Sequence, residues 1–447
     1  MPTLAVVVGL GAGLGTIAFI WLIHFFKALF FGEGAQVAPA LGAAYVIFLP
    51  AIGGLLVGPI VHYIAPEAKG HGVPEVMLAV ATRGGRIRPI VVLAKTVCSA
   101  ITIGSGGSVG REGPIVQIGA AIGSNVGQFL KVNERRLITL VAAGAAAGIA
   151  ATFNAPIAGV MFAIEVILAE LAIRAFGTVV VAAVTASVIS RAVLGDSPAF
   201  SVPPHAMTHA WELALYLGLG VTAAFGALLY MKSIYLFEDL FATLRINGSL
   251  KPAVGGVLVG VLGYFLPQIF GTGFETITLT LTGVMSLVLL LLLVPAKILA
   301  TSLSIGSGAS GGVFAPALFV GAVLGAAYGK IAEAVFPSLG SVSGAYAMVG
   351  MAAVFAGAAR APMTAIMILF EMTQDYHMIL PLMFATVVST LLAHRFEPES
   401  IYTLKLKRRG IDVRARRDEN LMRAILVEEA MTPATELVTM DPATPIT

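Results

Sequence analysis

The sequence predicts an all-α, polytopic membrane protein in which two halves repeat the same tilted and broken helices. The composition, the succession of apolar segments and an internal repeat together predict this fold class. Hydrophobic residues occupy 58% of the 447 positions and charged residues only 11%, and mean hydropathy is +0.94. Because a soluble domain usually carries about 25% charged residues, this chain could not cover a water-facing surface of that size.

The composition also excludes several classes of function. A net charge of +3 over this length indicates no nucleic-acid partner. The single cysteine, Cys98, excludes a disulfide scaffold, a cysteine-based zinc site and an iron–sulfur cluster. The seven histidines are scattered, so we expect no metal site and no cofactor. Ser105 and Ser108 lie in a glycine-rich loop without a nearby histidine to activate them, so we expect no enzyme.

Apolar segments follow one another almost without pause up to about residue 394. The first, residues 4–31, is too long for a signal-peptide core and predicts a retained membrane helix. Later examples are residues 41–64, 179–194, 213–231 and 284–294. At about 20 apolar residues per span, the length allows on the order of a dozen or more spans. The segments between them are rich in glycine, proline and serine. Polar backbone at membrane depth must be buried in protein or line a cavity, so these breaks indicate a transport pathway.

An internal repeat relates the two halves of the chain. A shift of 202 positions aligns residues 94–127 with residues 296–329 without a gap, and places Lys95 on Lys297. A second block at a shift of 206 places Glu165 on Glu371. Repeated broken segments are typical of transporters and channels with a site at the repeat interface. The halves would span about 1–200 and 210–395, and the spacing is compatible with parallel or inverted repeats.

Three glycine-rich turns each enter a helix through a proline. The turns are Gly70, His71, Gly72 and Pro74; Gly110, Arg111, Glu112, Gly113 and Pro114; and Gly312, Val313, Phe314 and Pro316. Proline suits the first turn of a helix, and glycine allows close approach of a ligand to the backbone. Free N–H groups and the partial positive charge of a helix start together form an anion site. Three converging turns would bind a small anion weakly enough to release it, as conduction requires.

These motifs resemble those of the CLC family of chloride channels and proton/chloride antiporters. The resemblance rests on Gly-Arg-Glu-Gly-Pro at 110–114, Gly-x-Phe-x-Pro at 312–316, Phe-Asn-Ala-Pro at 153–156 and Gly-x-Gly-x-Pro at 70–74, and it covers residues 5–405. It implies a membrane domain over residues 1–400 with an inverted repeat. It also implies a homodimer in the lipid bilayer, with one pore per subunit for bound chloride and other small anions.

The resemblance carries roles over to individual residues. Glu112 matches the gating glutamate, whose carboxylate competes with the anion. The backbone N–H groups of Val313 and Phe314 match the central anion ligands, and Tyr402 matches a tyrosine whose hydroxyl donates to the same anion. His71, Gly72 and Gly113 complete the expected anion-binding set. Seven further residues are expected to support the turns of the pore: Gly70, Pro74, Gly110, Arg111, Pro114, Gly312 and Pro316.

The chain departs from the family pattern at two positions. His71 replaces the usual serine or proline, and protonation of an imidazole adds charge within the physiological range, so we expect pH-dependent conduction unless the ring is turned away into a hydrogen bond. Val166 replaces the second, inward-facing glutamate of proton-coupled members. This valine favours a chloride channel gated by Glu112, with a proton/chloride antiporter that uses another proton path as the alternative. We expect Glu165 to be structural, and Lys95 and Lys297 to snorkel or to pair with such acids.

The composition changes after residue 394, where basic residues become frequent. By the positive-inside rule, this tail is cytoplasmic, and we expect the membrane to be the inner membrane of a prokaryotic cell. Residues 401–428 would form a cytoplasmic linker. Residues 429–447, with Met-Thr-Pro at 431–433, resemble the start of a truncated CBS domain, whose missing part would take a nucleotide.

Overall fold

The computed structural model describes residues 1–33, 44–169, 173–196, 200, 209, 211–337 and 343–412. Over these residues the chain is helical and contains no strand beyond two isolated β-bridges. Eight of the described helices are long and apolar enough to cross a membrane, and several apolar helices are shorter. The shorter helices are the broken segments that the sequence predicts. Large apolar side chains such as Phe129 and Leu391 are exposed on the outside, as a lipid-facing surface requires.

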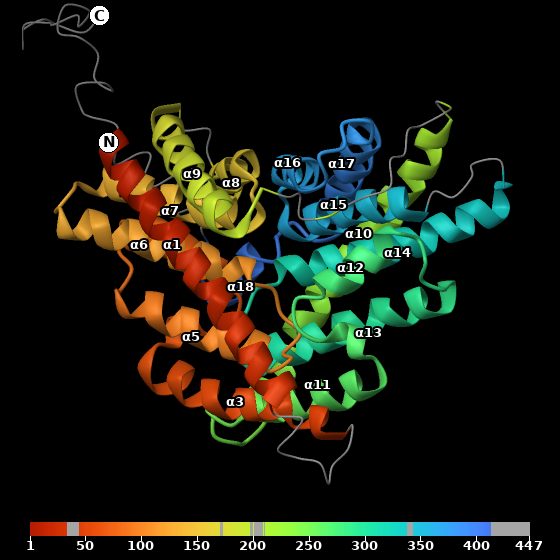
Figure 1. Ribbon diagram of the computed structural model, residues 1–447, viewed down its shortest axis with the longest axis horizontal. Coiled ribbons are helices and arrows are strands. Elements are labelled where there is room, and N and C mark those ends of the chain that lie inside the picture. Colours follow the sequence, from red (N-terminus) through yellow and green to blue (C-terminus); the bar gives the residue numbers. More distant parts are fainter. Residues whose placement is uncertain are drawn as a thin grey trace, which may run out of the picture.

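The two halves of the chain lie side by side, on the left and on the right of Figure 1. The first half contains α1 (Pro2–Lys27), α3 (Leu49–Pro59), α4 (Val73–Thr82), α5 (Ile90–Gly104), α6 (Glu112–Phe129), α7 (Glu134–Phe153), α8 (Pro156–Phe162) and α9 (Ile173–Leu194). Short 3-10 or π segments flank these helices: η1 (Ala28–Glu33), η3 (Ile60–Ile64), η4 (Pro66–Ala68) and η5 (Ala163–Leu168).

The second half follows the same order. It contains α10 (Glu212–Thr243), α11 (Lys251–Phe265), η6 (Pro267–Ile269), α12 (Phe274–Leu281), α13 (Leu287–Gly306), α14 (Phe314–Val335), α15 (Ser343–Ala359), α16 (Pro362–Thr373), α17 (Ile379–Phe396) and α18 (Thr403–Arg408). Helices α5, α6 and α8 on the left of Figure 1 correspond to α13, α14 and α16 on the right. The last helix, α18, returns to the centre between the halves (Figure 1) and packs against α4.

Equivalent positions of the repeat meet at the centre of the molecule. Gly110 N–H donates to the Gly312 carbonyl at 2.7 Å, and Gly312 N–H donates to the Gly110 carbonyl at 2.6 Å. These two residues are related by the shift of 202, and they form an antiparallel bridge. Each residue of the pair donates its N–H to the carbonyl of the other, so a local two-fold axis passes between them. The repeat found in the sequence is therefore a symmetry of the fold.

Glycines allow the closest helix crossings in each half. A Cβ on Gly119 of α6 would lie 2.1 Å from the Gly144 carbonyl oxygen of α7. The equivalent crossing is between α14 and α15, where a Cβ on Gly321 would lie 2.3 Å from the Gly350 carbonyl oxygen. Small residues let backbones approach in this way in membrane proteins, where packing rather than water drives association. These crossings pack α6 closely against α7 and α14 closely against α15.

Two equivalent glutamates each cap the start of a helix in the opposite half of the chain. Glu165 accepts hydrogen bonds from the N–H groups of Met363 and Thr364 at 3.1 and 2.8 Å, at the start of α16. Glu371 accepts hydrogen bonds from Ile157 and Ala158 at 3.0 and 2.7 Å, at the start of α8. A carboxylate satisfies the free N–H groups of a helix start and interacts favourably with its dipole. The structural role expected of Glu165 is consistent with this contact.

We expect Glu165→Ala to lower the free energy of unfolding by about 2 kcal/mol, because it leaves two N–H groups and the Thr364 hydroxyl without their acceptor. Thermal unfolding in detergent, compared with Glu165→Gln, measures this effect, and Gln should be milder because it keeps one acceptor oxygen. A loss below about 0.5 kcal/mol for the alanine variant would contradict the capping role.

The predicted linker and CBS segment lie mostly beyond the described residues. Helix α18 belongs to the packed part of the chain, since Tyr402 and Leu406 are buried there. Residues 413–428 of the expected linker, and the whole of residues 429–447, lie outside the described residues.

Candidate anion pathway

The three predicted turns converge at the crossing of the two halves. Gly70 pairs with Ser310 in a parallel bridge, next to the antiparallel bridge between Gly110 and Gly312. Gly70 N–H donates to the Ala309 carbonyl at 3.1 Å. The N-termini of α4, α6 and α14 are thereby brought to one place. The helix starts that the sequence singles out thus meet, although the start of α14 is more than 200 residues from those of α4 and α6 in the chain.

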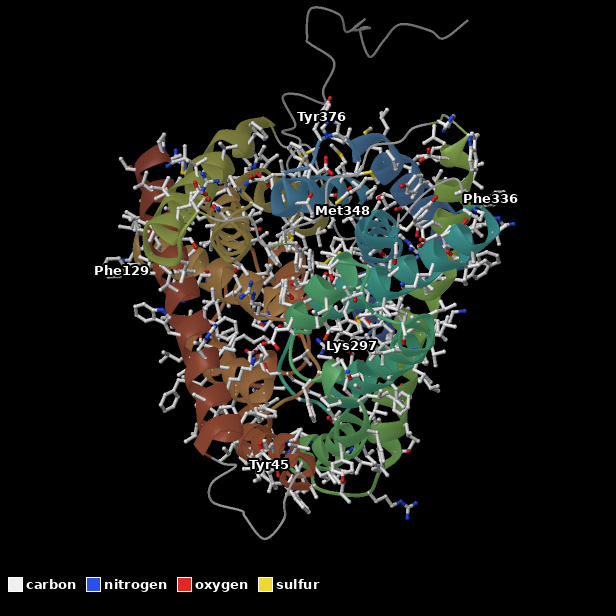
Figure 2. The ribbon with its side chains drawn as sticks, turned by 45° about the vertical axis from the view of Figure 1, so that its right-hand side comes forward. Tyr45, Phe129, Lys297, Phe336, Met348 and Tyr376 are labelled. Atoms are coloured by element: carbon white, nitrogen blue, oxygen red, sulfur yellow. The ribbon has the colours of Figure 1, made fainter. Side chains whose placement is uncertain are left out.

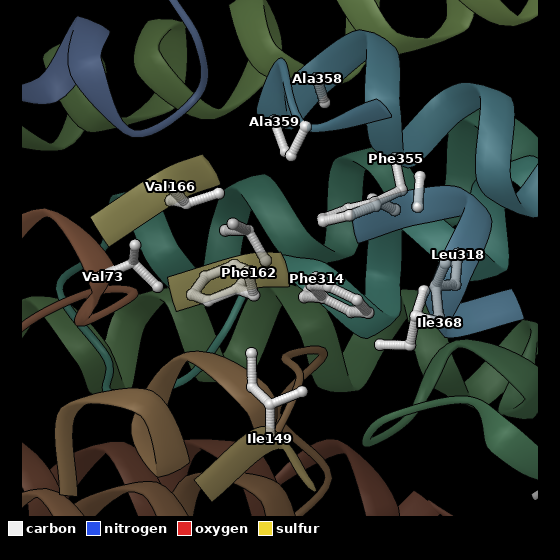
Figure 3. Close-up of a cluster of buried hydrophobic side chains, with 14 of the residues drawn as sticks. Val73, Ile149, Phe162, Val166, Phe314, Leu318, Phe355, Ala358, Ala359 and Ile368 are labelled. Atoms are coloured by element: carbon white, nitrogen blue, oxygen red, sulfur yellow. The ribbon is translucent and has the colours of Figure 1, made fainter. Parts of the chain in front are cut away.

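A small cavity lies at this meeting point. The residues that line it are His71, Val73, Glu112, Gly113, Val116, Ile149, Phe162, Val313, Phe314 and Tyr402. Figure 3 shows Phe162 and Phe314 close together, with Ile149 below them and Val73 to one side. The cavity leaves no room for a water molecule, so the path is closed here. Every expected anion-binding residue lines it except Gly72, which precedes α4 as its N-cap with a φ of 81°.

The Glu112 side chain reaches from the start of α6 to the start of α14. It is the first residue of α6, and its side chain is buried. Its Oε2 accepts a hydrogen bond from the Ala315 N–H at 3.1 Å, in the first turn of α14. Oε1 has no hydrogen-bond partner among the described residues. A carboxylate on the N-terminus of the neighbouring half makes the same contacts as a bound anion would. The Glu112 carboxylate therefore takes up a donor that an anion at the start of α14 would use.

His71 and Tyr402 also line the cavity. Both are buried, and their ring centroids are 5.9 Å apart. Neither ring nitrogen of His71 has a hydrogen-bond partner in the part of the chain that the structure describes. A histidine turned away into a hydrogen bond, the alternative left open by the sequence, is therefore not what the structure shows. A neutral imidazole here has one N–H to donate to an anion.

Tyr230 and Tyr235 of α10 position the site, and the sequence did not reveal them. The Tyr230 hydroxyl donates to the Val313 carbonyl at 2.8 Å and so fixes the turn before α14. The Tyr235 hydroxyl donates to the Ile401 carbonyl at 2.5 Å and so fixes the residue before Tyr402. In the sequence both tyrosines lie within a long apolar stretch and carry no motif. Their burial and position on α10 could not be read from that pattern.

Two buried lysines hold backbone turns rather than acids. Lys95 Nζ donates to the Ala68 carbonyl at 3.0 Å and to the Gly70 carbonyl at 2.6 Å. Lys297, in the interior of Figure 2, donates to the equivalent carbonyls of the second half, at residues 269 and 271. The expectation that these lysines snorkel or pair with acids is wrong. Their ammonium groups are satisfied by carbonyl oxygens, and Lys95 thereby anchors the turn that carries His71.

Arg111 supports its turn and also lines a larger cavity. Its guanidinium lies 4.8 Å from the Phe274 ring centroid and 5.8 Å from that of Phe153. The cavity of about 840 Å³ beside it is also lined by His24, Asn154 and Gln268, among others. Because Arg111 directly precedes Glu112, this cavity extends to the residue next to Glu112.

Val166 lies buried in η5, among apolar side chains (Figure 3). Its neighbour Glu165 uses both carboxylate oxygens to cap α16. The segment therefore offers no free carboxylate next to Val166 to carry a proton. Among the described residues, no cluster of histidine, cysteine, aspartate and glutamate is arranged to hold a metal ion.

Comparison with known proteins agrees with this geometry. The family model described as voltage gated chloride channel matches residues 53–394, which include all three turns. The chain belongs to the CLC family. It is 35% identical to a putative chloride channel protein, ClcB-like, of Ralstonia nicotianae, over 92% of this chain and 98% of that protein. It is also 35% identical to the H⁺/Cl⁻ exchange transporter ClcA of Vibrio cholerae, over 91% of this chain and 88% of that protein.

A solved CLC structure has the same fold. The crystal structure of a slow cyanobacterial Cl⁻/H⁺ antiporter superposes with a TM-score of 0.83 at 26% identity, covering 91% of this chain and 97% of the other. The predicted fold class, an all-α inverted repeat of the CLC type, is thereby confirmed. This CLC protein is a multi-pass integral membrane protein that transports chloride.

Proposed function

We propose that this CLC protein exchanges chloride for protons, with Glu112 as both the gate and the proton carrier. The observation that carries the proposal is the Glu112 carboxylate on the N-terminus of α14. An ionised carboxylate holds this place against an anion. Protonation removes the charge that binds it there, so the side chain can leave and an anion can enter. One residue then ties the movement of a proton to the movement of chloride.

The names of two of the proteins compared above support exchange rather than a passive channel, whereas the Ralstonia relative is named a putative chloride channel protein. ClcA of Vibrio cholerae is named an H⁺/Cl⁻ exchange transporter, and the cyanobacterial protein is described as an antiporter. The closed cavity around Glu112 also suits exchange, because a coupled carrier works by never opening a continuous pore.

A chloride channel is the second candidate, and Val166 favours it. A valine cannot carry a proton from the inner solution toward Glu112. Exchange therefore requires a proton path to Glu112 that avoids residue 166. Glu165 is unsuited to carry the proton because both its carboxylate oxygens accept hydrogen bonds. His71 lines the same cavity as Glu112 and has two unpartnered ring nitrogens, so it is the titratable group best placed to serve.

The protein works as a homodimer, by this proposal, in the inner membrane of a prokaryotic cell with its C-terminus in the cytoplasm. The basic residues after position 394 support that orientation. The permeant species are chloride and related small anions held as bound ions between the three turns.

Proton uptake into liposomes tests the proposal. Reconstituted protein is given an outward chloride gradient, and internal pH is recorded with an entrapped dye while an ion-selective electrode records chloride. Exchange predicts proton uptake that stops when chloride efflux stops. Chloride efflux at constant internal pH, with the membrane potential short-circuited, would instead identify a channel.

His71→Ser should change the pH dependence of chloride flux. Burial, and then the charges of Lys405, Lys95 and Arg409, hold the pKa of His71 well below its usual range. A pH-dependent component from this ring is therefore confined to the acid end of the flux profile, whereas serine does not titrate. We expect the profile to flatten at its acid end and the preference among anions to shift. Initial flux rates in chloride, bromide and nitrate, taken from neutral to acid pH, measure both effects, and an unchanged profile and preference would exclude the role of His71.

A further inference from the structure

Basic side chains gather where the connection between α4 and α5 meets the connection between α6 and α7. We call four of these exposed residues the basic junction: Arg83, Arg86, Lys131 and Arg136. Within the part of the chain that the structure describes, none of these four side chains forms a hydrogen bond or an ion pair. Arg88 beside them is already paired with Glu67. Glu134 is the only acidic residue within residues 83–89 and 130–136, so the junction carries an excess of positive charge.

Hydrogen bonds fix the two connections against each other. The Ser124 hydroxyl of α6 donates to the Gly85 carbonyl at 2.7 Å and accepts from the Ile87 N–H at 2.9 Å. The Gln128 side chain, near the end of α6, donates to the Ile87 carbonyl at 3.0 Å. The residues on either side of Ile87 therefore stay beside the end of α6, and their cations remain close to those that follow this helix.

Exposed apolar side chains border the basic junction. Phe129, the last residue of α6, is 86% exposed, and Figure 2 shows it projecting from the edge of the molecule. Leu130 follows it, and Leu93 in the first turns of α5 is 66% exposed. Apolar side chains that face a membrane contact acyl chains, and cations at the border of such a face meet the headgroups. This combination matches the two parts of a phospholipid.

The second half of the chain builds the corresponding connections without these cations. Residues 282–286 join α12 to α13 and residues 336–342 join α14 to α15, and neither segment contains a lysine or an arginine. The end of α14 carries one lysine, Lys330, followed three residues later by Glu333. The fold of such a connection therefore does not require basic residues. Because the repeat is inverted, the two sets of connections face opposite sides of the membrane, so the cations face one leaflet.

The backbone of Lys131 supports a role for its side chain. Its φ is 51°, in the left-handed region. At this place, just after a helix, glycine or asparagine is the usual residue, because other side chains are strained there. A lysine kept in a strained conformation points to a function of its side chain.

We propose that the basic junction binds the phosphate group of an anionic phospholipid in the leaflet that it faces. The guanidinium groups and the Lys131 ammonium donate charge-assisted hydrogen bonds to the phosphate oxygens, and the acyl chains lie along Phe129 and Leu93. Arg83 is the C-cap of α4, and Val73 at the other end of this helix lines the closed cavity. The bound lipid therefore stabilises a helix of the anion path. This role holds for an exchanger and for a channel alike.

Quenching of tryptophan fluorescence by brominated lipids tests the proposal. Phe129→Trp is made in a full-length chain whose native tryptophans, Trp21 and Trp211, are changed to phenylalanine. The protein is reconstituted in vesicles of phosphatidylcholine and phosphatidylglycerol, with one of the two lipids brominated in its acyl chains. We expect phosphatidylglycerol to bind beside residue 129 at least about fivefold more strongly than phosphatidylcholine. Ile331→Trp is the matched control, because the shift of 202 relates this exposed residue to Phe129, and it should show no preference.

Lys131→Gly separates lipid binding from a structural role. It removes one charge and places glycine in the conformation that glycine favours, so the preference for phosphatidylglycerol should fall about fivefold while the Tm is not lowered. Lys131→Asn, which also suits this conformation, should give the same result. Equal quenching by both lipids at residue 129 would overturn the proposal, as would a preference that both variants leave unchanged or a Tm that falls in both.

A soluble phosphate separates the headgroup from its chemistry. Glycerol 3-phosphate carries a phosphate without acyl chains, and an excess of it should leave the quenching by phosphatidylglycerol unchanged. Loss of that quenching would show that the basic junction is a site for soluble phosphates, which would also overturn the lipid proposal.

Discussion

Glu112→Gln abolishes chloride-driven proton movement and leaves chloride flux. The amide has the shape of a protonated carboxyl group but neither releases nor accepts a proton. We expect proton flux to fall by at least about 100-fold, the scale of losing a proton-transfer group, while chloride flux persists without coupling. Dye-reported pH and electrode-reported chloride in the same liposomes measure the two fluxes together.

Glu134→Gln is the control for that experiment. Glu134 is the first residue of α7 as Glu112 is of α6, but its side chain is exposed. It should leave both fluxes unchanged. Proton flux that survives in Glu112→Gln would show that another group carries the proton, and the competition between carboxylate and anion would then be irrelevant to coupling.

Lys95→Met destabilises the protein more than any surface change. The substitution removes the donor that satisfies the carbonyls of Ala68 and Gly70, and it leaves both acceptors in an interior without water. We expect a loss of about 3 kcal/mol, at the level of a broken buried charge-assisted network. Thermal unfolding in detergent measures it, and expression should fall as well.

Lys27→Met provides the comparison. Lys27 pairs with Glu275 at 2.7 Å, but both side chains are exposed, and such pairs contribute less than about 1 kcal/mol. If the two lysine variants unfold at the same temperature, the hydrogen bonds from Lys95 to the His71 turn make no special contribution to the free energy of unfolding.

The turns and the repeat could be predicted from the sequence because their signals are local. Glycine, proline and serine at fixed spacing mark the breaks, and a constant shift of 202 relates one half to the other. The chemistry of Glu112 follows from its place at a helix start. Its actual partner, the Ala315 N–H, lies in the other half and depends on how the two helix starts cross.

The remaining site residues depend on packing that no local pattern encodes. Lys405 lies in a basic tail that looks like the flank of a last membrane helix, yet its side chain is buried against Gly70. The sequence predicts that Lys95 snorkels or pairs with acids, whereas it binds backbone carbonyls, which have no signature in a sequence. Tyr230 looks like any aromatic residue of an apolar helix until its hydroxyl is seen to hold Val313.

The potential at which net current vanishes is the most direct test of exchange at Glu112. Protein in planar bilayers is exposed to a chloride gradient and to an opposing proton gradient, and the reversal potential is read. The exchanger proposed here predicts a reversal potential displaced from the chloride equilibrium potential when the proton gradient alone is changed, with a displacement that reports a fixed ratio of ions. A reversal potential equal to that of chloride at every proton gradient would contradict exchange and leave the chloride channel favoured by Val166.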